Sequence, residues 1–198
     1  MAKNMQPILK RCRTLGIEPG VMGVDKKSNR NPGGGQRKKK SEYAIQLNEK
    51  QKAKFIYGVL EKQFRKYFTL AEKKEGIAGE NLLSILESRL DNVIFRLGLA
   101  DTRRQARQIV THGHVLVNGK RVDVPSYLVS VGETVSVKES VANSDWMKDI
   151  VERNSTRAVP QWISFDKNTL SGAIVANAKR EDIDYEINET LIVELYSK

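Results

Sequence analysis

The sequence contains one cysteine, Cys12, in 198 residues. A single thiol cannot form a disulfide within the chain, so the sequence excludes a disulfide framework and favours a reducing compartment. It also argues against a zinc site, because one cysteine without a histidine near it cannot complete a tetrahedral shell. We therefore expect no metal centre around Cys12.

Long apolar runs are also missing from the sequence. No stretch approaches the roughly 20 apolar residues of a membrane-spanning helix, so we expect no membrane partner. The first residues lack an apolar segment followed by a small-residue cleavage site, and no secretory signal is predicted. With 39% apolar residues, the chain is long enough for one or two domains with a sizeable core.

Residue patterns of known catalytic sites are missing as well. The two histidines, His112 and His114, flank a glycine where no acidic or cysteine ligand has the local spacing of a metal site. Contacts to RNA or to the end of a helix suit them better. Gly33-Gly34-Gly35 lacks the strand and the lysine-serine ending of a phosphate-binding loop. The sequence therefore predicts a binding protein with no catalytic residue, no metal and no cofactor.

Positive charge is abundant and unevenly distributed. The chain carries a net charge of +10, and residues 1–40 hold 11 lysines and arginines against 2 acidic residues. The segment 31–35, Asn-Pro-Gly-Gly-Gly, interrupts regular structure before a run of four cations at 37–40. Such a concentration of charge is typical of an arm that binds a polyanion. The alternative is a flexible tail that keeps the protein in solution.

The segment from Asp101 to Val122 combines a short cationic helix with a hairpin. Thr102 and Gln105 have capping-box spacing, and three apolar residues share one helical face while three arginines share another. Asn118-Gly119 is a strong two-residue hairpin signal, followed by two cations. Guanidinium groups on a rigid element suit phosphate recognition. The alternative is a cationic face that is merely solvated.

An apolar helix is predicted just upstream of this segment. Leu90, Val93, Ile94 and Leu97 recur at helical spacing, and Arg89 and Arg96 are expected outside this apolar stripe. Together with the cationic helix and the hairpin, it would form a compact unit with one positive face. That arrangement points to structured RNA as the ligand.

The remaining pattern predicts an α+β fold. Ser41 and Asn48 compete as the N-cap of a first long helix, and Gly58 marks a break before a second one. The last 60 residues, 139–198, hold 7 basic and 11 acidic residues, which suits solvent or a basic protein better than phosphate. Beyond the hairpin we expect strands within 127–137 around a turn at Gly132, a helix after Ser144, strands at 162–165 and 173–175 around Ser171-Gly172, and a helix over 188–196.

The central unit resembles the RNA-binding module named after small-subunit ribosomal protein S-four. The likeness to that family extends in the same order across essentially the whole chain. It is carried by Ser41-Glu-Tyr-Ala44, Glu49-Lys-Gln-Lys52, Ile56-Tyr-Gly58, Lys62-Gln-Phe-Arg65, Leu86-Glu-Ser-Arg-Leu-Asp-Asn-Val93, Arg104-Gln-Ala-Arg107, His112-Gly-His114, Val117-Asn-Gly119, Pro125-Ser-Tyr127, Asn188-Glu189 and Leu191-Ile-Val-Glu-Leu-Tyr-Ser197.

The resemblance implies a structural protein of the small ribosomal subunit in the cytoplasm, with no enzyme activity. It would bind small-subunit ribosomal RNA at a junction of several RNA helices, act early in assembly and contribute to decoding accuracy. Implied protein partners are ribosomal protein S-five and, near the messenger entry site, ribosomal protein S-three. Some members hold zinc through four cysteines, but here Leu9 stands where a partner of Cys12 would be, which implies the zinc-free kind.

The resemblance also implies domains and site residues. A basic N-terminal extension (1–40) would precede the first part of a mostly helical, discontinuous domain (41–86). The two-helix and hairpin module (87–143) would be inserted there, and an α/β part (144–198) would pack with the helical domain. RNA-binding residues would be Arg37, Lys38, Lys39, Lys40, Lys50, Lys52, Arg65, Arg89, Arg103, Arg104, Arg107, His112, His114, Lys120 and Arg121. The S-five interface would be Asn188, Glu189, Leu191, Glu194 and Tyr196.

Two other functions use the same module. An RNA-modifying enzyme would carry it as a targeting arm, but such an enzyme needs a separate catalytic domain, and too little chain remains for one. A free RNA chaperone or repressor would bind RNA away from the ribosome. Co-sedimentation with the small subunit in stoichiometric amounts separates these alternatives from a ribosomal component.

Overall fold

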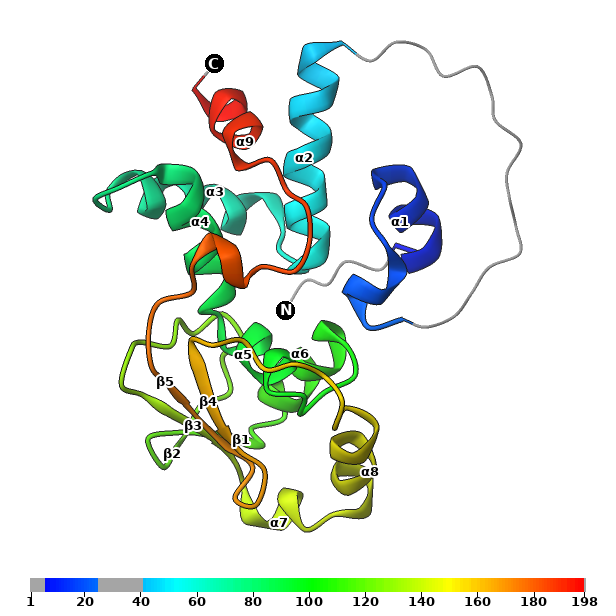
Figure 1. The fold of residues 1–198 in the computed structure, drawn as a ribbon, viewed down its shortest axis with the longest axis vertical. Coiled ribbons are helices and arrows are strands. Elements are labelled where there is room, and N and C mark those ends of the chain that lie inside the picture. The colour runs from blue at the N-terminus through cyan, green and yellow to red at the C-terminus, as the bar shows by residue number, and fades with distance from the viewer. Residues whose placement is uncertain (1–5, 25–40, 198) are drawn as a thin grey trace. The chain divides into compact units, whose positions relative to one another are not determined.

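The computed structural model describes residues 6–24 and 41–197, and the chain divides into two compact units. The helical unit combines the chain up to Gly79 with the residues from Tyr185 onwards, and the sheet unit runs from Glu80 to Asp184. The sheet unit is therefore inserted into a helical unit that is discontinuous in sequence (Figure 1). This arrangement confirms the predicted α+β fold class.

The helical unit gathers helices from both ends of the chain. Its long helix is capped by Ser41, whose hydroxyl accepts a hydrogen bond from the Ala44 amide at 3.3 Å. Of the two possible caps, the structure selects Ser41. Gly58, with φ +62°, ends the turn that follows, as predicted. The elements are α1 (Ile8–Leu15), the 3-10 turn η1 (Pro19–Met22), α2 (Glu42–Ile56), α3 (Glu61–Glu72), the first residues of α4 (Ala78–Glu87) and α9 (Glu189–Tyr196).

Helix α9 returns from the C-terminus to lie beside α2 (Figure 1). The buried Gln46 amide donates to Glu194 Oε2 at 3.0 Å, and the Asn188 amide donates to Glu49 Oε2 at 3.2 Å. The Tyr196 ring stacks on Phe68 with centroids 4.4 Å apart. The helix predicted over 188–196 is confirmed, and these contacts connect it to the first half of the chain.

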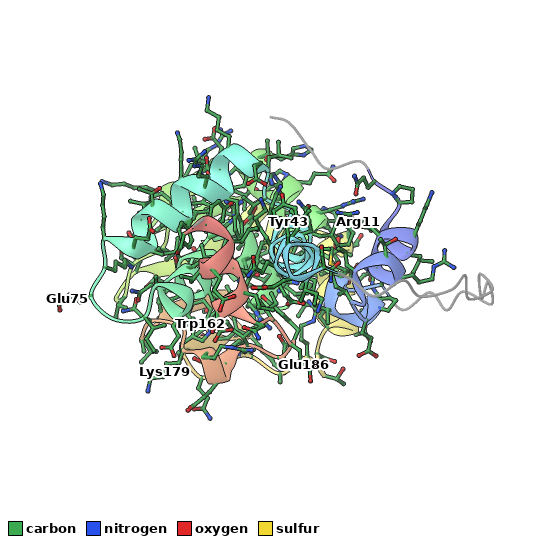
Figure 2. The ribbon with its side chains drawn as sticks, turned by 90° about the horizontal axis from the view of Figure 1, so that it is seen from above. Arg11, Tyr43, Glu75, Trp162, Lys179 and Glu186 are labelled. Carbon is green, nitrogen blue, oxygen red and sulfur yellow. The ribbon has the colours of Figure 1, made fainter. Side chains whose placement is uncertain are left out.

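Helix α1 also packs against α2. Figure 2 shows α2 along its axis and labels Arg11 on α1. Arg11 Nη2 donates to Gln51 Oε1 at 3.4 Å, while Cys12 and Leu15 are buried. Burial raises the pKa of the Cys12 thiol, so the thiol stays protonated near neutral pH. Within residues 6–24 and 41–197, no group of three or more acidic, histidine or cysteine side chains could hold a metal ion.

The sheet unit packs helices against a five-stranded antiparallel sheet of order β2-β1-β3-β5-β4. Ile109 and Val110 of α6 join Val115, Val135 and other buried residues in one apolar core. The elements are the rest of α4, α5 (Leu90–Arg96), α6 (Arg103–Thr111), β1 (Val115–Val117), β2 (Lys120–Arg121), β3 (Thr134–Val137), α7 (Glu139–Ala142), α8 (Asp145–Arg153), β4 (Ile163–Asp166), β5 (Ser171–Ile174) and η2 (Arg180–Asp182).

The division into units differs from the predicted domain boundaries. We expected residues 144–198 to pack with the helical domain, but the chain up to Asp184 lies in the sheet unit. The physical reason is the pairing of β5 with β3, which extends the sheet of the module across Val135 and Gly172. The residues from Tyr185 onwards do lie in the helical unit.

Two local predictions also needed correction. Ser171-Gly172 was expected to be the turn between two strands, but both residues lie within β5, and the turn falls between Asp166 and Ser171. Before Gly132, Leu128 makes an isolated bridge to Arg89 in place of a full strand. In the described part of the chain, none of the helices combines the length and apolarity that crossing a membrane requires.

Candidate nucleic-acid interface

Helix α6 starts much as the sequence predicts. The Thr102 hydroxyl accepts a hydrogen bond from the Gln105 amide at 3.1 Å. The Gln105 side chain, however, accepts from the Asp101 amide at 2.7 Å, one residue before the N-cap that a capping box would use. The start of α6 is therefore fixed from both directions, and with it the positions of the arginines that follow.

The hairpin forms at Asn118-Gly119, where both residues have positive φ (49° and 75°) as a type I′ turn requires. Asn118 Oδ1 accepts from the Thr134 amide at 2.9 Å, which ties the turn to β3. Lys120 and Arg121 follow at exposed positions of β2. The predicted hairpin is confirmed, and it presents two cations at the edge of the sheet.

Arg121 extends back over the end of α6. Gly113 ends that helix with φ +68°, and a Cβ at this position would collide with the Arg121 guanidinium. The backbone turn and the absence of a side chain together allow the Arg121 guanidinium to lie directly over Gly113. The Lys138 amide donates to the His114 carbonyl at 2.9 Å, which brings another cation to the same place.

We call this group the cationic cluster; its members are His112, His114, Arg121 and Lys138. Lys120 precedes Arg121 on β2, and because successive strand residues lie on opposite faces, it is not counted in the cluster. The pKa of His114 is lowered by burial first, and then by the positive charges of His112, Lys138 and Arg121. A bound anion would offset this repulsion and favour the protonated imidazole. The electrostatics of the cluster therefore suit a polyanionic ligand.

The three arginines of α6 do not share one exposed face, in contrast to the prediction. Arg104 is exposed, and Arg107 is partly covered with Nη1 4.0 Å from Asp91 Oδ2. Arg103 is only 7% exposed; its Nε donates to Asn92 Oδ1 at 2.8 Å, and its guanidinium lies 4.3 Å from the Phe95 ring centroid. Arg103 is therefore part of the packing between α5 and α6.

Arg89 was expected outside the apolar stripe of α5, and that expectation was wrong. Its side chain is buried, with the residue 1% exposed, and its guanidinium binds both oxygens of Asp91 at 3.0 and 2.6 Å. All seven residues of α5 are buried. The charged Asp91 and Arg96 can be buried with the others because each is paired with an opposite charge inside the unit. This position does not suit direct contact of Arg89 with RNA.

A second buried network was not predicted from the sequence. Arg96 binds both oxygens of the buried Glu87 at 2.9 and 3.0 Å and Asp184 at 2.9 Å. The amide of Asn92 also donates to Glu87 Oε2 at 2.7 Å. The sequence does place carboxylates near arginines in this segment, which indicates that ion pairs are possible. It does not indicate which residues pair.

Arg157 is another structural arginine that sequence reasoning missed. Its Nη1 donates to the Ala100 carbonyl at 2.9 Å and to the Phe95 carbonyl at 3.2 Å. Its guanidinium also lies 4.5 Å from the Phe95 ring centroid, so this ring contacts two guanidinium groups, those of Arg103 and Arg157.

In the helical unit, two of the predicted RNA-binding lysines are ion-paired. Lys50 Nζ lies 3.0 Å from Glu61 Oε1, and Lys52 Nζ lies 2.7 Å from Glu49 Oε1. Arg65 is exposed on α3, where it lines a surface depression together with Lys62, Lys66 and others. The predicted residues Arg37, Lys38, Lys39 and Lys40 lie outside the described residues.

The predicted protein interface on α9 is partly used within the chain. The side chains of Glu194 and Tyr196 bind Gln46 and Glu61, at 3.0 Å each, and the Asn188 side chain caps the helix by accepting from the Leu191 amide at 3.4 Å. Asn188 and Glu194 are nevertheless exposed, and Glu189 and Leu191 are partly exposed. The outer surface of α9 thus remains open to solvent in this chain.

Two family models match the chain. The model described as Ribosomal protein S4/S9 N-terminal domain matches residues 3–87, and the S4 domain model matches residues 88–135. The second range contains α5, α6, the hairpin and most of the cationic cluster.

Curated proteins with the name "Small ribosomal subunit protein uS4" resemble the chain over its full length. The protein from Agathobacter rectalis is 57% identical, that from Lachnospira eligens 54%, and that from Fusobacterium nucleatum 52%, each over 198 residues. In all three, 100% of this chain and 100% of the relative are covered.

Proposed function

The chain belongs to the uS4 family of small ribosomal subunit proteins, and on that premise we propose how its charged surfaces bind ribosomal RNA. The protein is a structural constituent of the small ribosomal subunit, located in the ribosome, and it binds the RNA of that subunit. The relatives are named as parts of a ribosomal subunit and not as enzymes, so the RNA-modifying enzyme is not supported.

The cationic cluster is proposed as the main RNA contact of the sheet unit. The observation that carries this proposal is the position of the exposed Arg121, whose guanidinium lies over Gly113, between the two histidines in the sequence. Burial lowers the pKa of His114, and the charges of His112, Lys138 and Arg121 lower it further. Phosphate groups would relieve that repulsion, and the guanidinium of Arg121 supplies donors in fixed geometry. Arg104, exposed on α6, would extend this surface, with Arg107 at its partly covered border.

Arg89 and Arg103 are proposed to position this surface without touching RNA. Arg103 connects α6 to α5 through Asn92, and Arg89 holds Asp91 close to Arg107. These contacts fix the orientation of α6 relative to α5. A rigid phosphate-binding surface loses less conformational entropy on binding than a mobile one.

The helical unit and the N-terminal segment would add further RNA contacts. Arg65, with Lys62 and Lys66, offers an exposed cationic side of α3. Lys50 and Lys52 are paired with carboxylates, so we propose that they support RNA binding through the local field. The run of four cations at 37–40 is proposed to bind phosphates on the basis of its charge.

Separate basic surfaces suit an RNA junction, where backbones of several helices converge. We therefore propose that the protein binds at such a junction early in subunit assembly and contributes to decoding accuracy. The exposed side of α9, with Asn188 and Glu194 and an acidic C-terminal balance, is proposed as the contact for ribosomal protein S-five. Ribosomal protein S-three and messenger RNA near the entry site are proposed as further neighbours.

A filter-binding titration with a small-subunit ribosomal RNA transcript tests the RNA surface. Arg104→Ala combined with Arg121→Ala should weaken binding and reduce the slope of log affinity against log salt by about two units, one per lost phosphate contact. Lys167→Ala, which removes an exposed cation from β4–β5 outside the surface, is the matched control and should change the slope little. Equal slopes for all three proteins would contradict the proposed surface.

Sucrose-gradient sedimentation tests the ribosomal role against a free RNA chaperone. The protein should co-sediment with the small subunit at one copy per subunit and stay there at moderate salt. A chaperone would be substoichiometric and would appear mainly in the light fractions. That outcome would favour the alternative.

A further inference from the structure

The sheet unit holds an exposed tryptophan next to the cationic cluster. Trp146, in the first turn of α8, is 43% exposed, whereas the other tryptophan, Trp162, is 3% exposed. Exposing this much indole surface to water is unfavourable, because burying apolar area is the main gain that a tryptophan brings to a fold. Exposed aromatic residues also occur elsewhere on the chain, such as Tyr43 at 59%, so the surroundings of Trp146 decide what its exposure means.

The Trp146 ring continues a series of aromatic rings that leads into the cluster. Its centroid lies 6.4 Å from that of His114, with 51° between the ring planes. The His114 ring lies 5.8 Å from His112 in an edge-to-face arrangement of 72°. The exposed indole is thus placed directly beside groups that attract phosphate.

The charges around the ring are arranged asymmetrically. On the side of the hairpin, Arg121 and Lys138 act electrostatically on His114. On α8 itself, the exposed Asp145 precedes Trp146 and the exposed Asp149 follows one helical turn later, with the exposed Lys148 between them in sequence. Two carboxylates against one ammonium make α8 less favourable to phosphate than the hairpin, while an uncharged aromatic ring is acceptable over the indole.

We propose that Trp146 and His114 form a stacking site for an unpaired RNA base, whose neighbouring phosphates are bound by Arg121, Lys138 and His112. An exposed aromatic ring beside a cationic surface offers the two contacts, base stacking and phosphate binding, on which single-stranded nucleic-acid recognition depends. In a duplex the bases are already stacked and their faces covered, so duplex RNA would use only the cations. This proposal rests on the proposed RNA-binding function and specifies the class of nucleotide at the site.

A protein partner is the other class of molecule that could cover Trp146. The cluster disfavours it, because a partner would have to place carboxylates opposite several cations and at the same time avoid Asp145 and Asp149. One extended RNA strand satisfies both conditions, because its phosphates can face the cations of the cluster while an uncharged base lies over Trp146 near the two aspartates. The charge pattern therefore favours RNA.

Tryptophan fluorescence and affinity test the site with two RNA probes of equal length. The probes are a six-nucleotide oligoadenylate and a six-base-pair RNA duplex, and the full chain is used throughout. Because the exposed and buried tryptophans emit differently, oligoadenylate should quench the exposed component, and Trp146→Leu should abolish that response. The duplex should bind without quenching.

The affinity of variants gives the second readout. Trp146→Leu should weaken oligoadenylate binding about tenfold with an unchanged salt slope, because stacking carries no charge. Trp146→Phe should restore part of the loss. Tyr43→Leu is the matched control: Tyr43, labelled in Figure 2, is an exposed aromatic of the helical unit and should have no effect. The buried Trp162 reports in every variant of Trp146 that the sheet unit is folded.

The outcomes separate the stacking site from RNA binding as a whole. If Trp146→Leu binds oligoadenylate and the ribosomal transcript as well as the unchanged protein does, the stacking site is wrong and the proposed function stands. A fluorescence response of Trp146 to small-subunit ribosomal proteins, with none to RNA, would also overturn it. Failure of the unchanged protein to bind the ribosomal transcript would overturn the proposed function itself.

Discussion

The arginines of the sheet unit differ in what their guanidinium groups contact, and this decides their roles. Arg89, Arg96 and Arg103 are buried and bound to carboxylates or an amide, whereas Arg104 and Arg121 are exposed. Removing a buried charge partner leaves another buried group unsatisfied, which is costly. Removing an exposed arginine changes mainly the electrostatic potential at the surface where a ligand binds, and has little effect on stability.

Arg103→Ala is expected to destabilise the protein, and Arg104→Ala is not. The first change leaves Asn92 Oδ1 without its donor and exposes Phe95, and should lower the free energy of unfolding by about 2 kcal/mol. The second should change it by less than about 0.5 kcal/mol but reduce the salt slope of RNA binding by about one unit. Urea unfolding and filter binding measure the two effects. Similar unfolding free energies for both variants would contradict this division of roles.

The histidines of the cationic cluster should make RNA binding depend on pH. In the free protein, burial and nearby cations lower the pKa of His114 below its ordinary value. Bound phosphates favour the protonated form and raise that pKa, so RNA binding takes up protons. Affinity at constant salt should therefore increase as pH falls from about 7.5 to 5.5, through the ordinary histidine pKa of about 6.5.

His112→Gln with His114→Gln is the corresponding variant. It should flatten the pH dependence of filter binding to the ribosomal transcript over the same range. It should also lower the affinity at pH 7.5, because the proposed phosphate contact of His112 and the stacking surface of His114 are lost. An equally steep dependence in the variant would assign the proton uptake to other groups.

At the scale of elements, the junction of α6 and the hairpin depends on Gly113. Its positive φ favours glycine, and its contact with the Arg121 guanidinium leaves no room for a Cβ unless that side chain moves. Gly119 has a similar φ of +75°, but a Cβ there would meet nothing within 4 Å. Substituting each glycine in turn therefore distinguishes the effect of backbone strain, common to both, from the displacement of Arg121, which occurs only at Gly113.

Gly113→Ala and Gly119→Ala should lower the free energy of unfolding by similar amounts. Both changes carry the left-handed backbone cost of roughly 1–2 kcal/mol, and the Arg121 guanidinium, the end of a flexible side chain, can move away from Gly113 at little cost. Gly113→Ala should in addition weaken binding to the ribosomal transcript, because Arg121 leaves the cluster. If both alanine variants bind RNA equally well, the position of Arg121 over Gly113 is not important for binding.

Local signals in the sequence were sufficient for some elements and not for others. The Asn118-Gly119 turn and the caps at Ser41 and Thr102 depend on neighbouring residues, and the structure confirms them. The failure at Gly172 has a distant cause: Leu97 packs so closely on this glycine that a Cβ would collide with it. A glycine kept for close packing inside a strand looks the same in sequence as a glycine in a turn.

The buried arginines could not be recognised for the same reason. Arg89 and Arg104 are both arginines in an amphipathic pattern, and only tertiary contacts place one inside and the other at the surface. The sequence therefore indicated the segment on which we propose the RNA surface, but not which of its cations face outward. Trp146 was overlooked because a single tryptophan on a short helix is normally a core residue.

At the scale of the whole molecule, α9 closes the helical unit by a contact between distant parts of the chain. Glu61 on α3 accepts from Tyr196 of α9 at 3.0 Å and from Lys50 and Lys54 of α2 at 3.0 and 2.6 Å. Burial raises the pKa of Glu61, but the hydrogen bonds from these three residues outweigh it and lower the pKa to about 2. The ionised carboxylate thus helps to hold three helices together.

A carboxyl whose pKa is lower in the folded than in the unfolded state stabilises the fold at any pH above its unfolded-state pKa. This stabilisation is lost as the pH falls towards the folded-state pKa. Glu61→Gln should therefore lower the free energy of unfolding at pH 7, and the difference from the unchanged protein should shrink between about pH 4.5 and pH 2. Because the side chain is 48% exposed, solvent screening keeps the effect at about 1 kcal/mol or less. Urea unfolding at pH 7 and pH 3 measures it, and Glu72→Gln on the same helix is a control. A difference that is constant across this range would exclude the ion pairs as its source.

The log affinity of the whole protein for RNA should be a sum of contributions from separate basic regions. Of the net charge of +10, residues 1–40 carry +9, while the cationic cluster lies in the sheet unit. If these regions bind phosphates independently, their contributions to the salt slope add, because each contact releases its own counterions. Replacing Arg37, Lys38, Lys39 and Lys40 by glutamine should reduce the slope by up to about four units.

Combining this change with Arg104→Ala and Arg121→Ala tests whether the regions bind together. Independent contacts predict that the losses in log affinity add within experimental error. A loss in the combined variant much smaller than the sum would mean that the basic run and the cluster compete for the same phosphates. Additive losses would fit the proposed junction, because a junction offers several RNA backbones to the separate basic regions at once.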